Sequence, residues 1–406
     1  MKKTIALLVV FFSFTSILLW SSCSGQVKEN NKTEANTQTK KIIGGGCDGC
    51  ELMYEGMPKN ISSVDTSDGW FEPGEKLLVT GIVLNLDGKT PAKDVVIYYW
   101  QTDNNGYYSP SKDMNKNAIR HGHIRGWVKS DAQGRYSIYT IRPMPYPNDN
   151  IPAHIHISIK EPGLANEYYT DDLVFDDDKK LTSEERKKLP NRGGSGILRP
   201  VKINGMQVAE HNFIVGLNIP DYPSPKISGI RSGLQVGEDN PSFIPYHAWG
   251  PDKGTRTCPV CKYGRYQGIL YFAGEKESRE DIENWLSFLE QQSIERDRYL
   301  KAYFVYGNEN DFSKTKRQAE LEKIGQKLNI HKMALTYVPS FNDQETEVFL
   351  NKVNPAASNT IVIYRNSNII ANYVNLKPTI ENFNELTSFL DKTKSAYADY
   401  AANKPD

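Results

Sequence analysis

Residues 152–159 of the 406-residue chain read PAHIHISI, and they give the strongest signal for both the fold and the candidate site of its first half. The residues from His154 onward are typical of a β-strand. Because side chains along a strand repeat every two residues, His154 and His156 are expected on the same face of the sheet. Two imidazoles on one face form a pair of metal ligands, whereas a single histidine in a sheet is more often structural.

Further strand-like segments surround this stretch on both sides. They are rich in β-branched and aromatic residues, and they span 76–86, 94–100, 126–130, 135–141 and 211–219. Two neighbouring pairs among them indicate hairpins, around turn residues 87–88 and 131–134. Short strands at this spacing predict an antiparallel β-sandwich, which we place over residues 46–220.

Two tyrosines in turn-like segments accompany the histidine pair. Residues 100–108 read WQTDNNGYY and residues 142–147 read RPMPYP, which makes Tyr108 and Tyr146 candidates for a shared site. A purely structural interpretation is also open: Tyr146 then caps a proline-rich turn and Tyr108 packs at the rim of the sheet.

In the order of these tyrosines, histidines and strands, the sequence resembles the intradiol ring-cleavage dioxygenases, the protocatechuate and catechol family. The resemblance covers about 150 residues in the family order. Its pieces are Trp100-Gln101 with Tyr108, Arg125-Gly126, Ser130-Asp131 through Gly134 and Tyr136, residues 140–143, Tyr146-Pro147, residues 152–156, and the later segments 173–175 and 211–215.

The resemblance implies a fold, a cofactor and a reaction. Tyr108 and Tyr146 would be phenolate ligands of a non-haem Fe(III), and His154 and His156 the imidazole ligands. Hard phenolates favour Fe(III), and a bound metal removes their protons despite a free pKa near 10. The implied substrates are a catecholic compound and O2, with a cis,cis-muconate-type product. Tyr146 would be the catalytic base that the substrate displaces.

One position departs from the family pattern. The family usually carries an arginine immediately before Pro-Ala-His, where its charge stabilises the substrate carbanion, but this chain has Ile151. Arg120, Arg125 and Arg142 are possible substitutes. A protein that binds iron or catechols in the envelope without turnover therefore stands as a second hypothesis.

The chain after the sandwich changes character. Residues 221–255 are rich in proline and glycine and indicate a linker that is able to pack on one neighbouring domain. Residues 256–395 alternate strands with helices, including a capping-box pattern at Ser278-Arg-Glu-Asp281. This part resembles a thioredoxin-like domain, followed by a tail at 396–406, so the predicted fold class is multidomain: a β-sandwich and then an α/β domain.

Cysteines are the other chemical signal. Cys258 and Cys261 form a Cys-x-x-Cys pair, but the pair precedes a strand, whereas in active thioredoxins it follows one and opens a helix. We expect a structural disulfide there; thiol-disulfide exchange and metal binding are the alternatives. Cys47 and Cys50 could form a second, local disulfide, and metal binding or free thiols are again open.

The start of the chain indicates export. Two lysines and an apolar run over 5–20 predict a signal peptide at 1–22. Ser21-Ser22-Cys23 resembles a bacterial lipoprotein processing site, so Cys23 is expected to carry lipid at the head of a flexible tether, 23–45. We therefore expect an exported lipoprotein of the cell envelope, in the periplasm or on the outer-membrane surface, that contacts the membrane through its anchor.

Composition excludes one class of partner. Lys+Arg and Asp+Glu both total 49, so the net charge is zero and a general affinity for nucleic acid is not expected. Hydrophobic residues make up 38% and charged residues 24%, which fits globular packing and not wholesale disorder.

Overall fold

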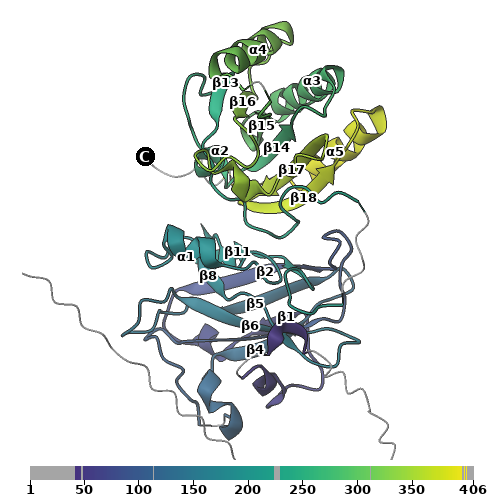
Figure 1. Cartoon of the computed structure of the whole chain (residues 1–406). Helices are drawn as coiled ribbons and strands as arrows, with labels where there is room; N and C mark the ends of the chain where they lie inside the picture. Colours follow the sequence, from purple (N-terminus) through teal and green to yellow (C-terminus); the bar gives the residue numbers. More distant parts are fainter. Residues whose placement is uncertain are drawn as a thin grey trace, which may run out of the picture. The chain divides into compact units, whose positions relative to one another are not determined.

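The computed structural model describes residues 42–46, 49–112, 114–223, 229–310, 312–395, 397 and 399. The predicted signal peptide, Cys23 and Cys47 lie outside the described residues, as does most of the predicted tail. Within the described part of the chain, three six-stranded sheets account for the β-structure (Figure 1). No helix among these residues is long and apolar enough to cross a membrane.

Two of the sheets make up the first half of the chain. One has the order β1-β5-β2-β11-β10, with β12 also pairing with β2, and the other has the order β4-β3-β6-β8-β9, with β7 also pairing with β6. The bounds of the first sheet are β1 Val64–Thr66, β2 Lys76–Leu84, β5 Arg135–Ile141, β10 Val201–Ile203, β11 Met206–Glu210 and β12 Phe213–Ile214. Those of the second are β3 Val96–Gln101, β4 Arg125–Lys129, β6 His154–Lys160, β7 Tyr168–Tyr169, β8 Leu173–Phe175 and β9 Ile197–Leu198.

The inner faces of these two sheets share one hydrophobic core. Alternate residues of β2, such as Leu77 and Val79, are buried in the same cluster as Ile155 and Ile157 of β6. Strands with this period of two bury one face, and β-branched side chains pack well on such a pleated surface. The predicted sandwich is therefore present as two sheets packed face to face.

The predicted strand pairing is wrong in two respects. The expected hairpins do not form: β2 pairs with β5 and β3 pairs with β4, so the segments on either side of each turn belong to opposite sheets. The sandwich is also mixed and not purely antiparallel, because β1 with β5, β11 with β2, β12 with β2, and β8 with β9 run parallel. A turn signal shows that the chain reverses, but the partner of a buried strand is chosen by tertiary packing.

The third sheet belongs to the second half of the chain and has the order β13-β16-β15-β14-β17-β18. Parallel pairing joins β14, β15 and β16, and antiparallel pairing joins the other neighbours. The bounds of its strands are β13 Tyr246–Trp249, β14 Gln267–Ala273, β15 Leu300–Gly307, β16 Ala334–Val338, β17 Asn359–Arg365 and β18 Asn368–Val374. The helices of this half are α2 Pro259–Tyr263, α3 Arg279–Arg296, α4 Lys314–Lys327 and α5 Ile380–Lys392. A further short helix, α1 Ser183–Lys188, belongs to the first half.

The predicted helix α3 is confirmed together with its start signal. The Ser278 side chain accepts a hydrogen bond from the Asp281 N–H at 3.0 Å, which satisfies an otherwise unpaired donor of the first turn. The apolar stripe of α3 is buried against the sheet with residues of α4 and α5. The predicted strands of this half are also present. The thioredoxin-like assignment stays a prediction.

The expected linker at 221–255 is partly wrong. Its end forms the strand β13, which pairs with β16 of the third sheet, and Leu234 and Phe243 are buried in the core of that half. The described end of this segment thus packs on the second half of the chain, as the sequence allowed, and contributes a strand that the sequence did not predict.

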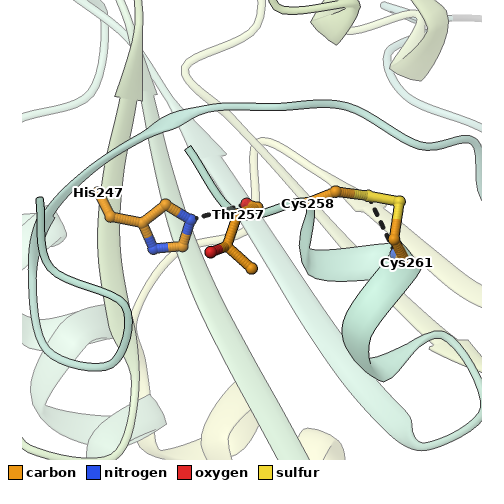
Figure 2. The surroundings of a disulfide bond; sticks show 4 residues. All are labelled: His247, Thr257, Cys258 and Cys261. Atoms are coloured by element: carbon orange, nitrogen blue, oxygen red, sulfur yellow. Dashed lines mark hydrogen bonds between the residues drawn. A yellow bond between two sulfur atoms is a disulfide. The ribbon is translucent and has the colours of Figure 1, made fainter. Parts of the chain in front are cut away.

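The structure contains a disulfide between Cys258 and Cys261 (Figure 2). Cys258 is the N-cap of α2, and its Sγ accepts the Cys261 N–H at 3.0 Å. The expectation that the pair lies away from a helix start is thus wrong, although the helix is only five residues long. His247 supports the segment, since its Nε2 lies 2.9 Å from the Thr257 carbonyl oxygen. Cys50 is also disulfide-bonded, and its expected partner Cys47 lies outside the described residues.

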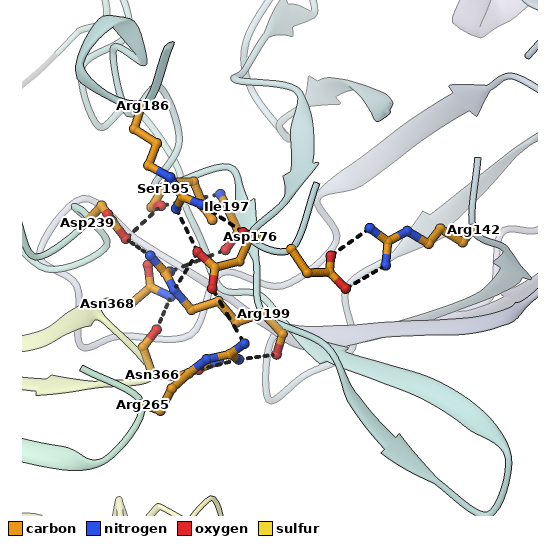
Figure 3. Close-up of polar contacts among 11 residues, drawn as sticks. Arg142, Asp176, Arg186, Ser195, Ile197, Arg199, Asp239, Arg265, Asn366 and Asn368 are labelled. Atoms are coloured by element: carbon orange, nitrogen blue, oxygen red, sulfur yellow. Dashed lines mark hydrogen bonds and ion pairs between the residues drawn. The ribbon is translucent and has the colours of Figure 1, made fainter. Parts of the chain in front are cut away.

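A polar network joins residues from both halves of the chain (Figure 3). Arg199, only 5% exposed, pairs with Asp239 at 2.7 Å. Asp176 pairs with Arg186 at 2.6 Å and with Arg265 at 3.5 Å, and Arg265 also donates to the Arg199 carbonyl oxygen at 3.0 Å. Because removing one partner would leave another charge poorly compensated, such a network fixes a specific set of neighbours.

Acidification should destabilise this fold partly through His211. The side chain is 4% exposed, its Nε2 donates to the Ser195 carbonyl oxygen at 2.9 Å, and burial lowers its pKa to about 4 from an ordinary 6.5. Between pH 6.5 and about pH 4, His211 is therefore protonated in the unfolded chain but neutral in the native state. The free energy of unfolding consequently falls as the pH drops through this range. The loss at pH 5 relative to pH 7 should be roughly 2 kcal/mol.

The measurement is chemical denaturation of the whole chain and of His211→Gln at both pH values. The variant should lose about 2 kcal/mol less than the parent on acidification. An equal loss in the two proteins would contradict this role of His211.

Candidate metal centre

The candidate site lies on the outer face of the second sheet. Ile155 and Ile157 of β6 point into the core, so the period of two turns His154 and His156 outward. In the register of β3 and β6, His156 lies opposite Trp100, and the two rings stack with centroids 4.8 Å apart. The expectation that both imidazoles share one face is met, with ring centroids 4.6 Å apart.

The four predicted residues come together. The Tyr108 hydroxyl lies 2.6 Å from the Tyr146 hydroxyl and 2.7 Å from His156 Nε2. The Tyr146 hydroxyl lies 3.1 Å from His154 Nε2. Residues from three separate segments thus direct two phenol oxygens and two imidazole nitrogens at one point.

Hydrogen bonds on the far side of each imidazole orient the ring. His154 Nδ1 donates to the Pro152 carbonyl oxygen at 2.7 Å, and His156 Nδ1 lies 2.9 Å from Asp172 Oδ1. Tyr169 also donates to Asp172 and contacts His156 Nδ1. With both Nδ1 atoms engaged, the Nε2 atoms are the ones presented to the tyrosines, as metal-ligating histidines require.

The Tyr108 loop is built around one buried carboxylate. Asp103 Oδ1 accepts the N–H groups of Asn105 at 2.8 Å and Tyr107 at 3.1 Å, and Oδ2 accepts the Ser109 hydroxyl at 2.6 Å. Burial alone would raise the pKa of Asp103, but these hydrogen bonds outweigh it and lower the pKa. The carboxylate is therefore ionised and holds the turn that presents Tyr108.

The loops that carry the two tyrosines are joined to each other. Thr102 donates its hydroxyl to the Met144 carbonyl oxygen at 2.6 Å, and the Met144 N–H donates to the Asp103 carbonyl oxygen at 3.3 Å. Gly106 has a φ of 84°, and an added Cβ there would lie 2.4 Å from the Pro145 carbonyl oxygen. Only glycine allows this close approach. These contacts explain how the distance between Tyr108 and Tyr146 is set.

The donor set fits a ferric ion. Two phenols and two imidazoles combine hard oxygen and nitrogen ligands, which suit Fe(III). Burial raises the pKa of Tyr108 and Tyr146 and lowers that of His154, so the unliganded groups are neutral and the phenols must lose their protons on metal binding.

A second ligand set shares part of this site. His154, His156 and Asp172 place one ligand atom each within 4.8 Å of one another. However, His156 Nδ1–H is directed at Asp172. If Nδ1 were to bind a metal together with Asp172, the hydrogen bond between these two residues would be lost. Asp172 is better explained as the support of His156. The hydrogen bond and charge of His156 lower the pKa of Asp172 although burial alone would raise it.

A cavity of about 380 Å³ opens onto the site. Its walls are mainly aromatic and cationic, and they comprise Gly46, Trp100, Tyr108, Arg120, His121, Tyr146, His156, Tyr169 and Arg192. This volume is in the range of small-molecule sites.

The three arginines proposed as substitutes for the missing one differ in position. Arg120 lines the cavity. Arg125 instead donates to the Tyr98 hydroxyl at 2.9 Å, and Arg142 pairs with Asp177 at 2.6 Å. Ile151 is 45% exposed.

Sequence reasoning missed several residues of the site, among them Asp103, His121, Tyr169, Asp172 and Arg192. A usable signal existed for one of them, because Asp172 directly precedes the predicted strand segment at 173–175. Nothing in the pattern around Arg192 indicates that its loop returns to the cavity.

The first half of the chain is similar to known proteins. Residues 52–213 match the family model described as "Dioxygenase". The chain is 35% identical over 107 residues to the protocatechuate 3,4-dioxygenase beta chain of Burkholderia cepacia, covering 25% of this chain and 43% of that protein. It is 31% identical over 187 residues to the chlorocatechol 1,2-dioxygenase of Pseudomonas sp. (strain P51), covering 41% and 65%.

Among solved structures, the chain is similar to the dioxygenase domain of a carbohydrate-binding fusion protein from Streptomyces sp. SirexAA-E. The identity is 23%, the TM-score is 0.29, and the match covers 39% of this chain and 88% of that one. The chain thus spans only 43% and 65% of the two curated relatives. Residues 52–213, which match the family model described as "Dioxygenase", are sheet-rich and contain the two tyrosines and two histidines of the site.

Proposed function

We propose that this protein is a non-haem Fe(III) intradiol dioxygenase that cleaves a catecholic ring with O2 to a cis,cis-muconate-type product. One observation carries the proposal: the hydroxyls of Tyr108 and Tyr146 and the Nε2 atoms of His154 and His156 contact one another in a continuous series. The similarity of residues 52–213 to ring-cleaving dioxygenases supports it. A ferric ion held by these four residues would activate a bound catechol toward O2.

Other residues of the site suit the binding of an aromatic ring and the transfer of its proton. The Trp100 and Tyr169 rings line the cavity and supply flat surfaces for an aromatic ring. Burial raises the pKa of Tyr146, so its hydroxyl oxygen retains a proton once it has received one from the substrate. Tyr146 is therefore the residue we assign as base, and Asp172 and Pro152 keep the two imidazoles in place.

A second candidate function is capture of catechols or iron without ring cleavage. The observation that favours it is Ile151, an exposed aliphatic side chain where the family usually has a cation. Oxygen uptake with a catechol separates the two functions, since a binding protein would consume none.

We further propose that the protein acts in the cell envelope as a lipoprotein. The support is the apolar run at 5–20 followed by Ser21-Ser22-Cys23. Catechol cleavage would then take place outside the cytoplasm.

The iron site predicts a coloured protein with one Fe(III) per chain. Replacing His154 by Ala removes one ligand, so iron affinity should fall by more than the roughly 10- to 100-fold typical of losing an outer-shell partner. Metal analysis and the visible tyrosinate-to-iron absorption band measure this. His331→Ala, an exposed histidine of the second half, serves as the control and should keep iron and colour. Stoichiometric zinc in an iron-replete preparation, or iron without the band, would count against the proposal.

The Asp103 turn gives a sharper test of Tyr108. Asp103→Asn retains the side-chain volume but loses one acceptor oxygen, so Tyr108 should be less well positioned and iron affinity should fall about 10-fold. Asp87 offers a matched control, because its carboxylate accepts the N–H groups of Lys89 and Thr90 and the Thr90 hydroxyl in the same kind of turn, outside the cavity. Asp87→Asn should leave the iron affinity unchanged. Equal effects of the two substitutions would show that the loss is one of general stability.

Lipidation predicts that the protein partitions into detergent and that Cys23→Ser abolishes this behaviour. Mass spectrometry of the mature N-terminus checks the modification directly. An unmodified N-terminus at another residue would end this proposal and would leave the iron site untouched.

A further inference from the structure

A second cavity lies in the half of the chain that the proposed reaction does not use. Its volume is about 130 Å³. Lys301 and Tyr303 line it from β15, and their spacing of two places them on one face of the third sheet. Tyr263 of α2 and Lys332, just before β16, also line it. A cavity with a few convergent polar groups of this kind is typical of a ligand site.

The Lys301 ammonium has aromatic neighbours in place of a carboxylate. Its Nζ lies 5.2 Å from the ring centroid of Tyr263 and 5.7 Å from that of Tyr266. It forms no ion pair and no hydrogen bond with any residue that the structure describes. Burial lowers the pKa of Lys301, as expected for a cation that loses water without gaining an anionic partner. The two ring faces compensate only part of that loss, so the ammonium has donors to offer to an anion.

The other charged groups of the cavity neutralise each other. Lys332 Nζ pairs with Asp297 Oδ1 at 2.6 Å. Asp297 is the one carboxylate among the described residues that line the cavity. His331 also lines it and adds a positive charge only when it is protonated. The charge left facing the cavity is therefore that of Lys301.

Tyr303 supplies a second donor beside Lys301. Its side chain is only 2% exposed, and among the described residues its hydroxyl has no hydrogen-bond partner. Buried hydroxyls are normally satisfied by protein, water or ligand, because leaving one unpaired is costly. Burial raises the pKa of Tyr303, so the hydroxyl keeps its proton and remains a donor. Lys301 and Tyr303 thus present an unpaired cation and an unpaired hydroxyl on the same face of β15.

We propose that this cavity binds a small organic monocarboxylate, whose charged group is held by the Lys301 ammonium and the Tyr303 hydroxyl. Pro251, Ala334 and the ring of Tyr263 provide an apolar wall for the rest of the molecule. Inorganic phosphate fits less well, because a dianion would need a second uncompensated cation and would turn polar oxygens toward that wall. The site lies in the second half of the chain and does not depend on the proposed ring cleavage.

The experiment measures how far an added anion shields Lys301 in the whole protein. A short pulse of N-acetoxysuccinimide acetylates accessible lysines, and mass spectrometry quantifies the modification at each one. The added ligands are n-butyrate, acetate and inorganic phosphate at constant ionic strength. Butyrate should suppress acetylation of Lys301 more strongly than acetate, because its chain reaches the apolar wall. Lys262 pairs with Asp252 at 2.8 Å outside the cavity lining, so its acetylation should not change.

Three substitutions test the charges by isothermal titration with butyrate. Lys301→Met keeps the unbranched stem and removes the cation, so affinity should fall about 10- to 100-fold, the range for a lost hydrogen bond to a charged group. Lys327→Met is the matched control, because Lys327 pairs with Glu283 outside the cavity lining, and it should retain full affinity. Asp297→Asn should tighten binding, since it removes the opposing charge and releases Lys332.

Tyr303→Phe separates ligand binding from stability. The substitution removes only the hydroxyl, so butyrate affinity should fall about 2- to 10-fold, as expected for one neutral hydrogen bond. The free energy of unfolding without ligand should stay the same or rise, because the hydroxyl has no described partner to lose. Chemical denaturation measures this second quantity.

The parent protein alone is enough to overturn the inference, since no substitution can then disturb its folding. Acetylation of Lys301 that no ligand suppresses, or that falls equally at Lys262, would do so. Full butyrate affinity in Lys301→Met would remove Lys301 from the site. Phosphate binding as tight as that of butyrate would overturn the assignment to a monocarboxylate.

Discussion

The pairing of β6 with β3 is the constraint on which the candidate site depends. Within β6, isoleucines face the shared core of the sandwich, and the strand period then forces His154 and His156 to the opposite face. The same register places Trp100 of β3 against His156. A slip of one residue would exchange the two faces, so placing the isoleucines in the core and placing the imidazoles on the outer face of the sheet are one condition.

Carboxylates near the site position other residues. Asp103 builds the turn that presents Tyr108, Asp171 holds the backbone of Arg192, and Asp172 orients His156. Each carboxylate is satisfied by N–H or O–H donors, which is the condition for keeping a charge at such depth. The geometry of the metal centre is therefore set by a second layer of polar contacts as much as by the four ligands.

The second half of the chain has a core of its own, and the segment once expected to be a linker joins it through β13. Contacts between Arg199, Asp239 and Asp176 continue to Arg265, which directly follows the turn after α2. The disulfide of Cys258 and Cys261 therefore belongs to a segment joined to the sandwich by a partly exposed ion pair between Arg265 and Asp176. Its placement at a short helix is compatible with a structural role.

Most of the strands, the shared face of the histidine pair and the identity of the four converging residues could be predicted from the sequence. The strands and the shared face follow from a local rule, the period of two in a strand, whereas the set of four residues was implied by the resemblance of the motifs to those of the intradiol dioxygenases. Sequence pattern also located the helix start at Ser278.

The strand pairing could not be predicted in this way, because the turns after β2 and β4 reverse the chain without specifying a sheet. Only the tertiary structure shows that Arg192, Tyr169 and Asp172 join a site whose tyrosines lie far earlier in the chain. Such contacts between distant segments arise when buried apolar faces choose their partners, and no local pattern of residues encodes that choice.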